Sequence, residues 1–250
     1  MPPKISIVRH AEGFHNQTRD YTIPDPLLTP KGKQQCADLS AVFPHHATAD
    51  LVVASPLRRT VQTASYSFGP TLKRDEVPFL LMPVLQEVSD SGADTGTDAS
   101  LLEKAYEEMF EGEDLKFDPK KIDRSQVTDG WNCNTGYYEY EFEKLSARAH
   151  DFRKWAFQRP ESHIIVVTHG AIAHFLTEDR DSENPMIHTT YRNCEVRDFV
   201  FTAESTAEKA DLVETKECKE RRRGQPKKVE EYVVKEVEGS LHGEEVKVAA

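Results

Sequence analysis

Two short apolar runs in this chain of 250 residues end in a histidine. Ile5-Ser6-Ile7-Val8 leads into Arg9-His10, and residues 164–167 lead into Thr168-His169. A neutral imidazole is a nucleophile, and a guanidinium offers a planar fork to the oxygens of a phosphate. The residue types therefore indicate chemistry on a phosphate group. In that chemistry His10 would attack, and Arg9 and His169 would hold oxygens.

A third apolar run, residues 51–54, leads into Ser55-Pro56-Leu57-Arg58-Arg59. Such β-branched runs predict buried strands, and ligands of open α/β sheets bind at the carboxyl ends of strands. Ser-Pro also predicts a helix start whose amides face an anion. We therefore expect Arg58 at the same phosphate, and we interpret Arg59 as a helix-surface cation or structural ion pair.

Strands alternate with helices along the chain, which predicts βαβ units and a mainly parallel sheet. We expect a three-layer α/β/α sandwich. Thr29-Pro30 begins one expected helix, and amphipathic spacing marks another over residues 141–157. The expected helices cover residues 30–43, 55–66, 98–111, 141–157 and 171–177, and further strands are expected at 76–81 and 195–201.

The pattern loosens between residues 88 and 140, which we interpret as a cap insertion over the pocket. Its aromatic residues Trp131, Tyr137 and Tyr138 are read as core of the cap in preference to a platform for substrate.

Several short blocks together resemble the histidine phosphatase superfamily, in its phosphoglycerate mutase-like group of fungal and plant type. They occur in family order from Lys4 to about Phe201. Ala11 stands where many members have Gly, and Ala occurs there in the fungal and plant branches. The blocks are Arg9-His10-Ala11-Glu12, Leu28-Thr29-Pro30-Lys31-Gly32, Ser55 through Ala64, Leu85-Gln86-Glu87, His169-Gly170 and Asn193-Cys194-Glu195-Val196-Arg197.

The resemblance implies a mechanism. His10 forms a phosphohistidine, while Arg9, Arg58 and His169 surround the phosphoryl oxygens. Glu87 protonates the leaving group and then activates water. No metal or cofactor is implied. The other nitrogen of His10 should donate to a carbonyl, which leaves the attacking nitrogen neutral.

Two residues of the loop after the first strand remain open. Asn16 matches a family position that contacts phosphate, and a turn-capping role is equally consistent with its type. His15 could reach the substrate, although an exposed loop histidine is the favoured interpretation.

The composition argues against several classes of binding partner and cellular location. A net charge of −11 argues against nucleic acid or an anionic membrane as a bulk electrostatic partner. Four cysteines without a Cys-x-x-Cys pair predict neither a zinc site nor a disulfide framework. We find no apolar run of membrane-spanning length and no signal-peptide core after Met1. The expectation is a cytoplasmic protein acting on a small phosphorylated substrate.

We expect a catalytic domain over residues 1–202 and a charged, disordered or loosely helical tail over 203–250, dispensable for catalysis. The basic runs Lys219-Glu220-Arg221-Arg222-Arg223 and Lys227-Lys228 leave a nuclear-import signal open, although a solvated tail is favoured. The tail could also tether a protein partner.

Three functions fit these observations. A phosphatase that hydrolyses phosphomonoesters is favoured. A phosphoglycerate mutase-type transferase is the alternative, but the acidic 88–140 insertion lacks the basic substrate motifs that the resemblance implies for mutases. A non-enzymatic interaction module on the same fold is the third. Such a module would have no need to retain His10, Arg58, Glu87 and His169 together, so their joint presence argues against it.

Overall fold

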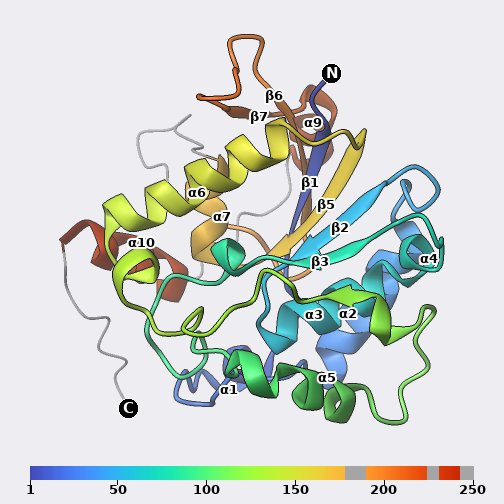
Figure 1. Cartoon of the computed structure of the whole chain (residues 1–250), viewed down its shortest axis with the longest axis vertical. Coiled ribbons are helices and arrows are strands. Elements are labelled where there is room, and N and C mark those ends of the chain that lie inside the picture. Colours follow the sequence, from blue (N-terminus) through green and yellow to red (C-terminus); the bar gives the residue numbers. More distant parts are fainter. Residues whose placement is uncertain (178–189, 224–230, 243–250) are drawn as a thin grey trace.

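The computed structural model describes residues 1–177, 190–223 and 231–242. Its centre is one seven-stranded sheet, in the order β4-β3-β2-β5-β1-β6-β7 (Figure 1). The strands are β1 (Lys4–Arg9), β2 (Leu51–Ala54), β3 (Phe79–Leu81), β4 (Ile122–Asp123), β5 (His163–Thr168), β6 (Val196–Phe201) and β7 (Leu212–Glu214).

The sheet is mainly parallel, as predicted. Strands β1, β2, β3, β4 and β5 run in one direction, and β6 and β7 are antiparallel to their neighbours. Arg9 at the end of β1 pairs in register with Thr168 at the end of β5. The two residues that follow, His10 and His169, therefore leave the sheet at the same edge.

Helices cover both faces of the sheet, which confirms the predicted three-layer α/β/α architecture (Figure 1). Helices α2 (Pro30–Val42), α3 (Arg58–Ser67) and α4 (Gly69–Leu72) cover one face, and α6 (Phe142–Phe157) and α7 (Gly170–Thr177) cover the other. Val8 lies in the hydrophobic cluster of the first face, whereas its neighbour Ile7 lies in that of the second. This alternation is expected for a strand buried on both sides.

Helix α2 begins where Thr29-Pro30 predicts it. The Thr29 hydroxyl accepts the Gly32 N–H at 3.0 Å, and Pro30 occupies the first helical position. A Cβ at Gly32 would lie 2.1 Å from the carbonyl oxygen of Glu12, so only glycine allows the helix to approach the loop after β1. Glu12 also stabilises this contact between α2 and the loop, through an ion pair of 2.6 Å with Lys31.

The segment over residues 88–140 contributes side chains between Leu102 and Trp131 to the core of the first face, whereas the Tyr137 hydroxyl donates to Asp151 of α6 on the second face. The segment contains α5 (Leu102–Phe110), the 3₁₀ turns η2 (Ala99–Leu101), η3 (Pro119–Lys121) and η4 (Gly136–Tyr138), and the edge strand β4. Trp131 is 1% exposed and lies in the core, as predicted. Tyr137 is 40% exposed and is a surface residue instead.

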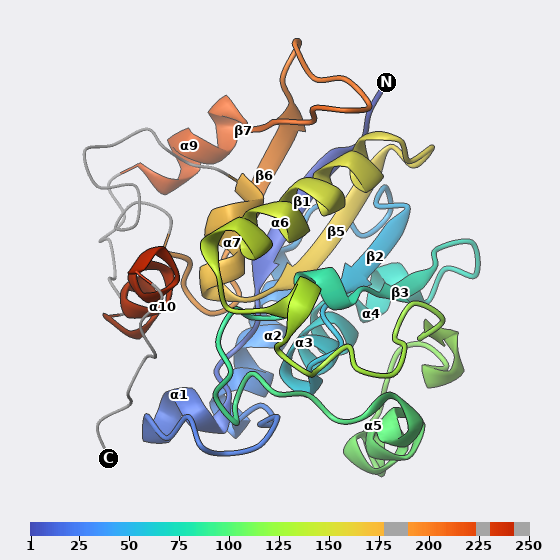
Figure 2. The same ribbon diagram turned by 60° about the vertical axis from the view of Figure 1, so that its left-hand side comes forward.

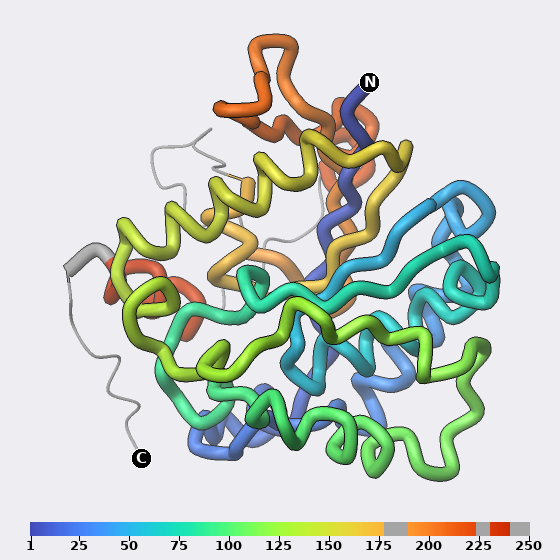
Figure 3. Tube along the Cα trace, viewed as in Figure 1, coloured from blue at the N-terminus to red at the C-terminus, as the bar shows by residue number. Residues whose placement is uncertain are grey.

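Two further short elements flank the site. Helix α1 (Phe14–Thr18) follows β1, and the turn η1 (Pro83–Leu85) follows β3. The loop after α1 runs beside the segment after η1, because Ala93 N–H donates to the Tyr21 carbonyl at 2.9 Å and Asp25 N–H to that of Gly92 at 3.1 Å. Figure 3 traces the two segments along the chain.

The predicted boundary at residue 202 and the disordered tail are wrong for the described part of residues 203–250. Strand β7 extends the sheet, and helices α9 (Lys216–Arg222) and α10 (Glu231–His242) follow it. Val233 and Val237 of α10 are buried in the cluster that includes α7 (Figure 2). These two valines, one helical turn apart, form an apolar stripe that the high charge of the region obscured.

The first basic run of the predicted import signal is part of this packed structure. Arg222 forms an ion pair of 2.5 Å with Glu214, and Arg221 lies 3.5 Å from Asp198. Lys227-Lys228 lies outside the described residues. No helix in the described ranges is long and apolar enough to cross a membrane.

Candidate active site

His10 lies directly after β1 and is 2% exposed. Its Nδ1 is 2.7 Å from the carbonyl oxygen of Ala11, which places the ring proton on Nδ1 and leaves a lone pair on Nε2. This contact confirms the predicted carbonyl partner. Burial, and then the charges of Arg59 and Arg9, hold the pKa of His10 well below its usual value, so the imidazole is neutral.

Three imidazoles gather here. The ring of His10 lies 5.2 Å from that of His169 and 5.6 Å from that of His15, centroid to centroid. The favoured interpretation of His15 as an exposed loop residue is wrong, because its side chain is buried. Gly13 makes room for it: a Cβ there would lie 2.7 Å from the His15 ring. Burial lowers the pKa of His15 strongly, with smaller contributions from Arg59 and Arg9.

His169 follows β5, and its Nε2 is 2.9 Å from the hydroxyl of Ser55 at the end of β2. The Ser55 oxygen also accepts the Leu57 N–H at 3.3 Å. We assign the Ser55 hydroxyl as the donor to Nε2, which puts the ring proton of His169 on Nδ1. That Nδ1 is buried and has no hydrogen-bond partner among the described residues.

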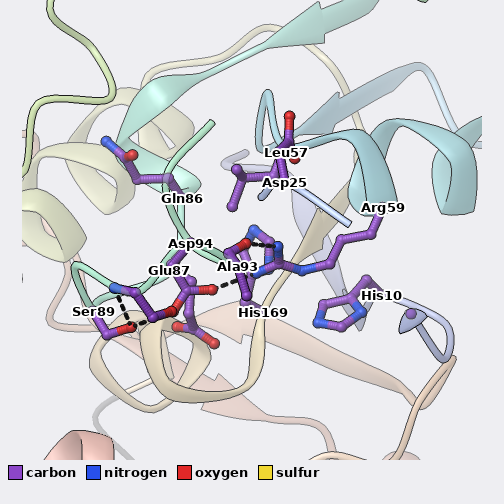
Figure 4. A network of polar contacts seen from close by, with 12 residues as sticks. His10, Asp25, Leu57, Arg59, Gln86, Glu87, Ser89, Ala93, Asp94 and His169 are labelled. Atoms are coloured by element: carbon purple, nitrogen blue, oxygen red, sulfur yellow. Dashed lines mark hydrogen bonds and ion pairs between the residues drawn. The ribbon is translucent and has the colours of Figure 1, made fainter. Parts of the chain in front are cut away.

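Arg59, in the first turn of α3, brings a second guanidinium whose charge, like that of Arg9, acts on His10. Its Nη2 donates to Asp94 at 2.7 Å, and its Nη1 donates to the Ala93 carbonyl. The Arg59 side chain is 1% exposed, and within the described structure its Nε has no hydrogen-bond partner. Figure 4 shows this side chain reaching between His10 and Asp94. Arg9 is held by the carbonyl of Tyr191 at 2.7 Å.

Arg58 is not placed at the histidines, which corrects the predicted site. Its Nε donates to the carbonyl of Asp25 at 2.7 Å and its Nη2 to that of Pro24 at 3.2 Å. Its backbone N–H donates to the Asp25 carboxylate at 2.9 Å. The first amide of α3 therefore binds a carboxylate of the protein itself, and the Arg58 side chain fixes the loop before α2.

Helix phase explains why Arg59, and not Arg58, faces the site. Residues i and i+4 share a helix face, and Thr63, four positions after Arg59, accepts the Ala11 N–H at 3.0 Å. This face of α3 thus lies against the end of β1. Consecutive residues of a helix point about 100° apart, so Arg58 faces elsewhere. Gln62 and Thr63 lie three and four positions after Arg59 and are buried. This helical spacing was the sequence signal that Arg59 belongs to the buried face of α3.

Glu87 lies just after η1, and its carboxylate accepts N–H groups from the first turn of α7. The distances are 3.1 Å from Ala171 and 2.9 Å from Ile172. The side chain is buried. Burial raises the pKa of Glu87 to about 7, and the charge of Asp94 adds to the rise, against the two backbone hydrogen bonds and Arg59. Glu87 can thus carry or accept a proton near neutral pH.

The loop that carries Glu87 is fixed on both sides. The Thr168 hydroxyl donates to the Leu85 carbonyl at 2.7 Å. The Gln86 side chain donates to the Trp131 carbonyl at 2.7 Å, and Arg148 donates to the Gln86 carbonyl. The position of Glu87 is therefore set by β5, by α6 and by the 88–140 segment.

Asn16 has the capping role. Its Oδ1 accepts the Gly13 N–H at 3.0 Å at the start of α1. A phosphate contact through its amide nitrogen stays a prediction. Asn193 supports the site from the other side, because its Nδ2 donates to the His10 carbonyl at 2.9 Å.

The assembled groups suit a phosphoryl anion. Buried polar atoms are normally hydrogen-bonded, yet Arg59 Nε and His169 Nδ1 have no partner among the described residues. Both are donors, and both lie beside a neutral His10 with a free lone pair. An acceptor with several oxygens would satisfy them. The described residues include no group of three or more His, Cys, Asp or Glu side chains able to hold a metal ion.

Comparisons with solved structures show the same fold. A phosphoserine phosphatase mutant of Entamoeba histolytica, solved with phosphoserine, superposes with a TM-score of 0.52 at 18% identity, over 85% of this chain and 95% of that chain. A putative α-ribazole-5′-phosphate phosphatase of Escherichia coli gives 0.52 at 19% identity over the same shares.

Sequence comparisons identify relatives with higher sequence identity. A phosphoglycerate mutase-like protein of Arabidopsis thaliana is 27% identical over 79% of this chain and 83% of its own length. A probable phosphatase of Schizosaccharomyces pombe is 26% identical over 66% of this chain and 73% of its own length. The family model of the histidine phosphatase superfamily, branch 1, matches residues 5–210. The chain therefore belongs to the histidine phosphatase superfamily.

Proposed function

We propose that this protein hydrolyses small phosphomonoesters through a phosphohistidine on His10. The observation that carries the proposal is the pair of unpartnered buried donors, Arg59 Nε and His169 Nδ1, beside a neutral His10. Membership of the superfamily and the phosphatases of like fold support hydrolase chemistry in general.

The first step is attack by the lone pair of His10 Nε2 on phosphorus. The bond to the substrate oxygen breaks, and charge spreads over the phosphoryl oxygens, where Arg9, Arg59 and His169 donate. Glu87 gives its proton to the departing oxygen. A pKa of about 7 leaves Glu87 substantially protonated near neutral pH, as a general acid requires.

The second step reverses the proton transfer. Glu87, now ionised, takes a proton from water as the water attacks the phosphohistidine, and His10 leaves as a neutral imidazole. Inorganic phosphate and a reprotonated Glu87 complete the cycle. A mutase would replace water by a second substrate hydroxyl, so release of inorganic phosphate separates the two functions.

The test is Glu87→Gln, assayed on two substrates. An alkyl phosphate has a poor leaving group, and its hydrolysis should slow by roughly 10²–10⁴-fold, the usual contribution of a general acid. Hydrolysis of p-nitrophenyl phosphate should hardly change, because nitrophenolate leaves without protonation. Equal losses on the two substrates would show that Glu87 only shapes the site. A panel of phosphorylated metabolites, assayed for phosphate release, would identify the substrate.

We also propose that turnover needs no metal, because side chains supply the positive charge at the phosphoryl group. EDTA should leave the rate unchanged, and vanadate should inhibit. A purified protein that requires added magnesium would contradict this part of the proposal.

A further inference from the structure

Helix α10 brings a third carboxyl group to the acid side of the site. Glu236 is 1% exposed, and its side chain lies against that of Asp94, close enough to Glu87 for their charges to interact. Asp94 is the residue that pairs with Arg59. Asp94 thus connects Glu236 to Arg59, the arginine beside His10, although Glu236 lies more than 140 residues after Asp94 in the chain.

Aromatic contacts hold α10 in this position. Tyr232 stacks on Tyr21, with 3.5 Å between ring centroids and 11° between the planes. Its hydroxyl is 3.5 Å from that of Ser89, which in turn donates to Asp94 at 2.5 Å. The Tyr140 hydroxyl donates to the backbone carbonyl of Glu236. One helix face therefore contacts the loop after α1, the loop after η1 and the segment before α6.

The charges of the cluster do not balance if every carboxyl group is ionised. Glu87, Asp94 and Glu236 face two guanidinium groups: Arg59 pairs with Asp94, and Arg148 lies near Glu87. Among the described residues, Tyr140, Tyr232 and Asp90 also interact with this cluster, and none of them brings a positive charge. One carboxyl group must hold a proton, because an unpaired charge is costly to bury.

When Glu87 is ionised during the reaction, it and Asp94 match the two guanidinium groups, so Glu236 is the group that stays protonated. Burial raises its pKa well above the ordinary value, and the charges of Glu87 and Asp94 raise it further. A protonated carboxyl group is a donor, and the Asp94 carboxylate beside it is an acceptor. Its Oε1 has no partner within the described structure, which fits an uncharged group better than a carboxylate.

We propose that Glu236 is a positioning residue of the phosphatase reaction, which donates a hydrogen bond to Asp94 as a neutral acid and excludes water from the acid side of the site. The proposal rests on the function proposed above, with Glu87 as the general acid. It assigns α10, a helix beyond residue 210 where the family match ends, to the active site.

The consequence is a shift of the pH profile. Desolvation is the largest cause of the raised pKa of Glu87. Removing the Glu236 side chain admits water beside Asp94 and Glu87, so the pKa of Glu87 should fall. Fewer molecules then carry the acid proton at neutral pH. Glutamine fills the same volume and still donates to Asp94, so Glu236→Gln should preserve the profile.

The kinetic test compares four proteins on an alkyl phosphate: the native protein, Glu236→Ala, Glu236→Gln and the control Glu238→Gln, which changes an exposed carboxylate of the same helix. The basic limb of kcat/KM should move to lower pH by about one unit in Glu236→Ala, within the range that desolvation produces. It should stay in place in the two glutamine variants. An equal loss at every pH in Glu236→Ala would mean a merely structural role.

A second measurement does not depend on turnover. Infrared difference spectra at pH 7 between the native protein and Glu236→Gln should show the loss of a protonated carboxyl C=O band. If that band is not lost, Glu236 is ionised and the proposal is overturned. If the band is lost but the Glu236→Ala profile is unshifted, the positioning role fails while Glu87 chemistry stands. If the native protein releases no phosphate, the proposed function fails, and the positioning role fails with it.

Discussion

Replacing Arg59 by lysine should remove most of the catalytic rate. The Arg59 guanidinium spans the Ala93 carbonyl and the Asp94 carboxylate with its two terminal nitrogens and leaves Nε for a phosphoryl oxygen. Lysine keeps the positive charge but has no planar fork, so it cannot reach all three positions. The variant should retain the charge opposite Asp94 and lose the donor to the transition state.

The expected magnitude follows from that donor. Losing one preorganised donor to a developing oxyanion costs about 10²–10³-fold in kcat, or roughly 3–4 kcal/mol of transition-state stabilisation. The Arg59→Lys variant should therefore fall in this range on p-nitrophenyl phosphate. Its KM should change less than its kcat, because the interaction is strongest in the transition state.

Arg58→Lys is the matched control. The Arg58 side chain is 27% exposed and binds Asp25 and Pro24 rather than the histidines. Its replacement should leave kcat within about threefold and cost about 1 kcal/mol of stability or less, as for other partly exposed ion pairs. Thermal melts of both variants would separate folding from catalysis. A larger loss in Arg58→Lys than in Arg59→Lys would refute the assignment.

Three further outcomes are expected. On an alkyl phosphate, kcat/KM should fall as pH rises through about 7, because Glu87 acts in its protonated form and its pKa is raised to about 7. The acid limb of the profile should lie well below pH 6.5, because the pKa of His10 is lowered. An acid limb at pH 6.5 would contradict a buried neutral imidazole. A protein ending at Arg223 should melt at a lower temperature and lose activity, because it exposes the face of α7 that Val233 and Val237 cover; unchanged melting and turnover would show that α10 is dispensable. Gly96→Ala should destabilise by about 1–3 kcal/mol in denaturant titrations, because its Cβ would lie 2.2 Å from the Trp131 ring; an unchanged midpoint would mean that the ring yields freely.

Local signals made the frame of the fold predictable. Thr29-Pro30 predicted a helix over residues 30–43, and α2 runs over Pro30–Val42. The apolar run before His169 predicted a strand, and β5 covers it. Both depend on neighbours within a few residues, through a cap and through side-chain alternation. The carbonyl partner of His10 was predictable from the chemistry instead, because attack by Nε2 requires the ring proton on Nδ1.

Long-range features were not predictable from such signals. The choice between Arg58 and Arg59 depends on the rotational phase of α3 about its axis, which packing against β1 sets. The burial of His15 depends on how the loop after β1 folds back. The docking of α10 depends on Tyr232 meeting Tyr21, more than 200 residues earlier in the chain. Dense charge around Val233 and Val237 also hid a helix with a narrow apolar stripe.

Chemical trapping of the phosphorylated enzyme tests the central claim most directly. The native protein should be mixed with an excess of substrate, quenched within milliseconds in alkali, where phosphohistidine is stable, and digested for mass spectrometry. The account predicts one phosphoryl group on His10, formed and lost at rates compatible with turnover. Phosphate release at the native rate with no phosphoryl group on His10, or with the group on another residue, would contradict it.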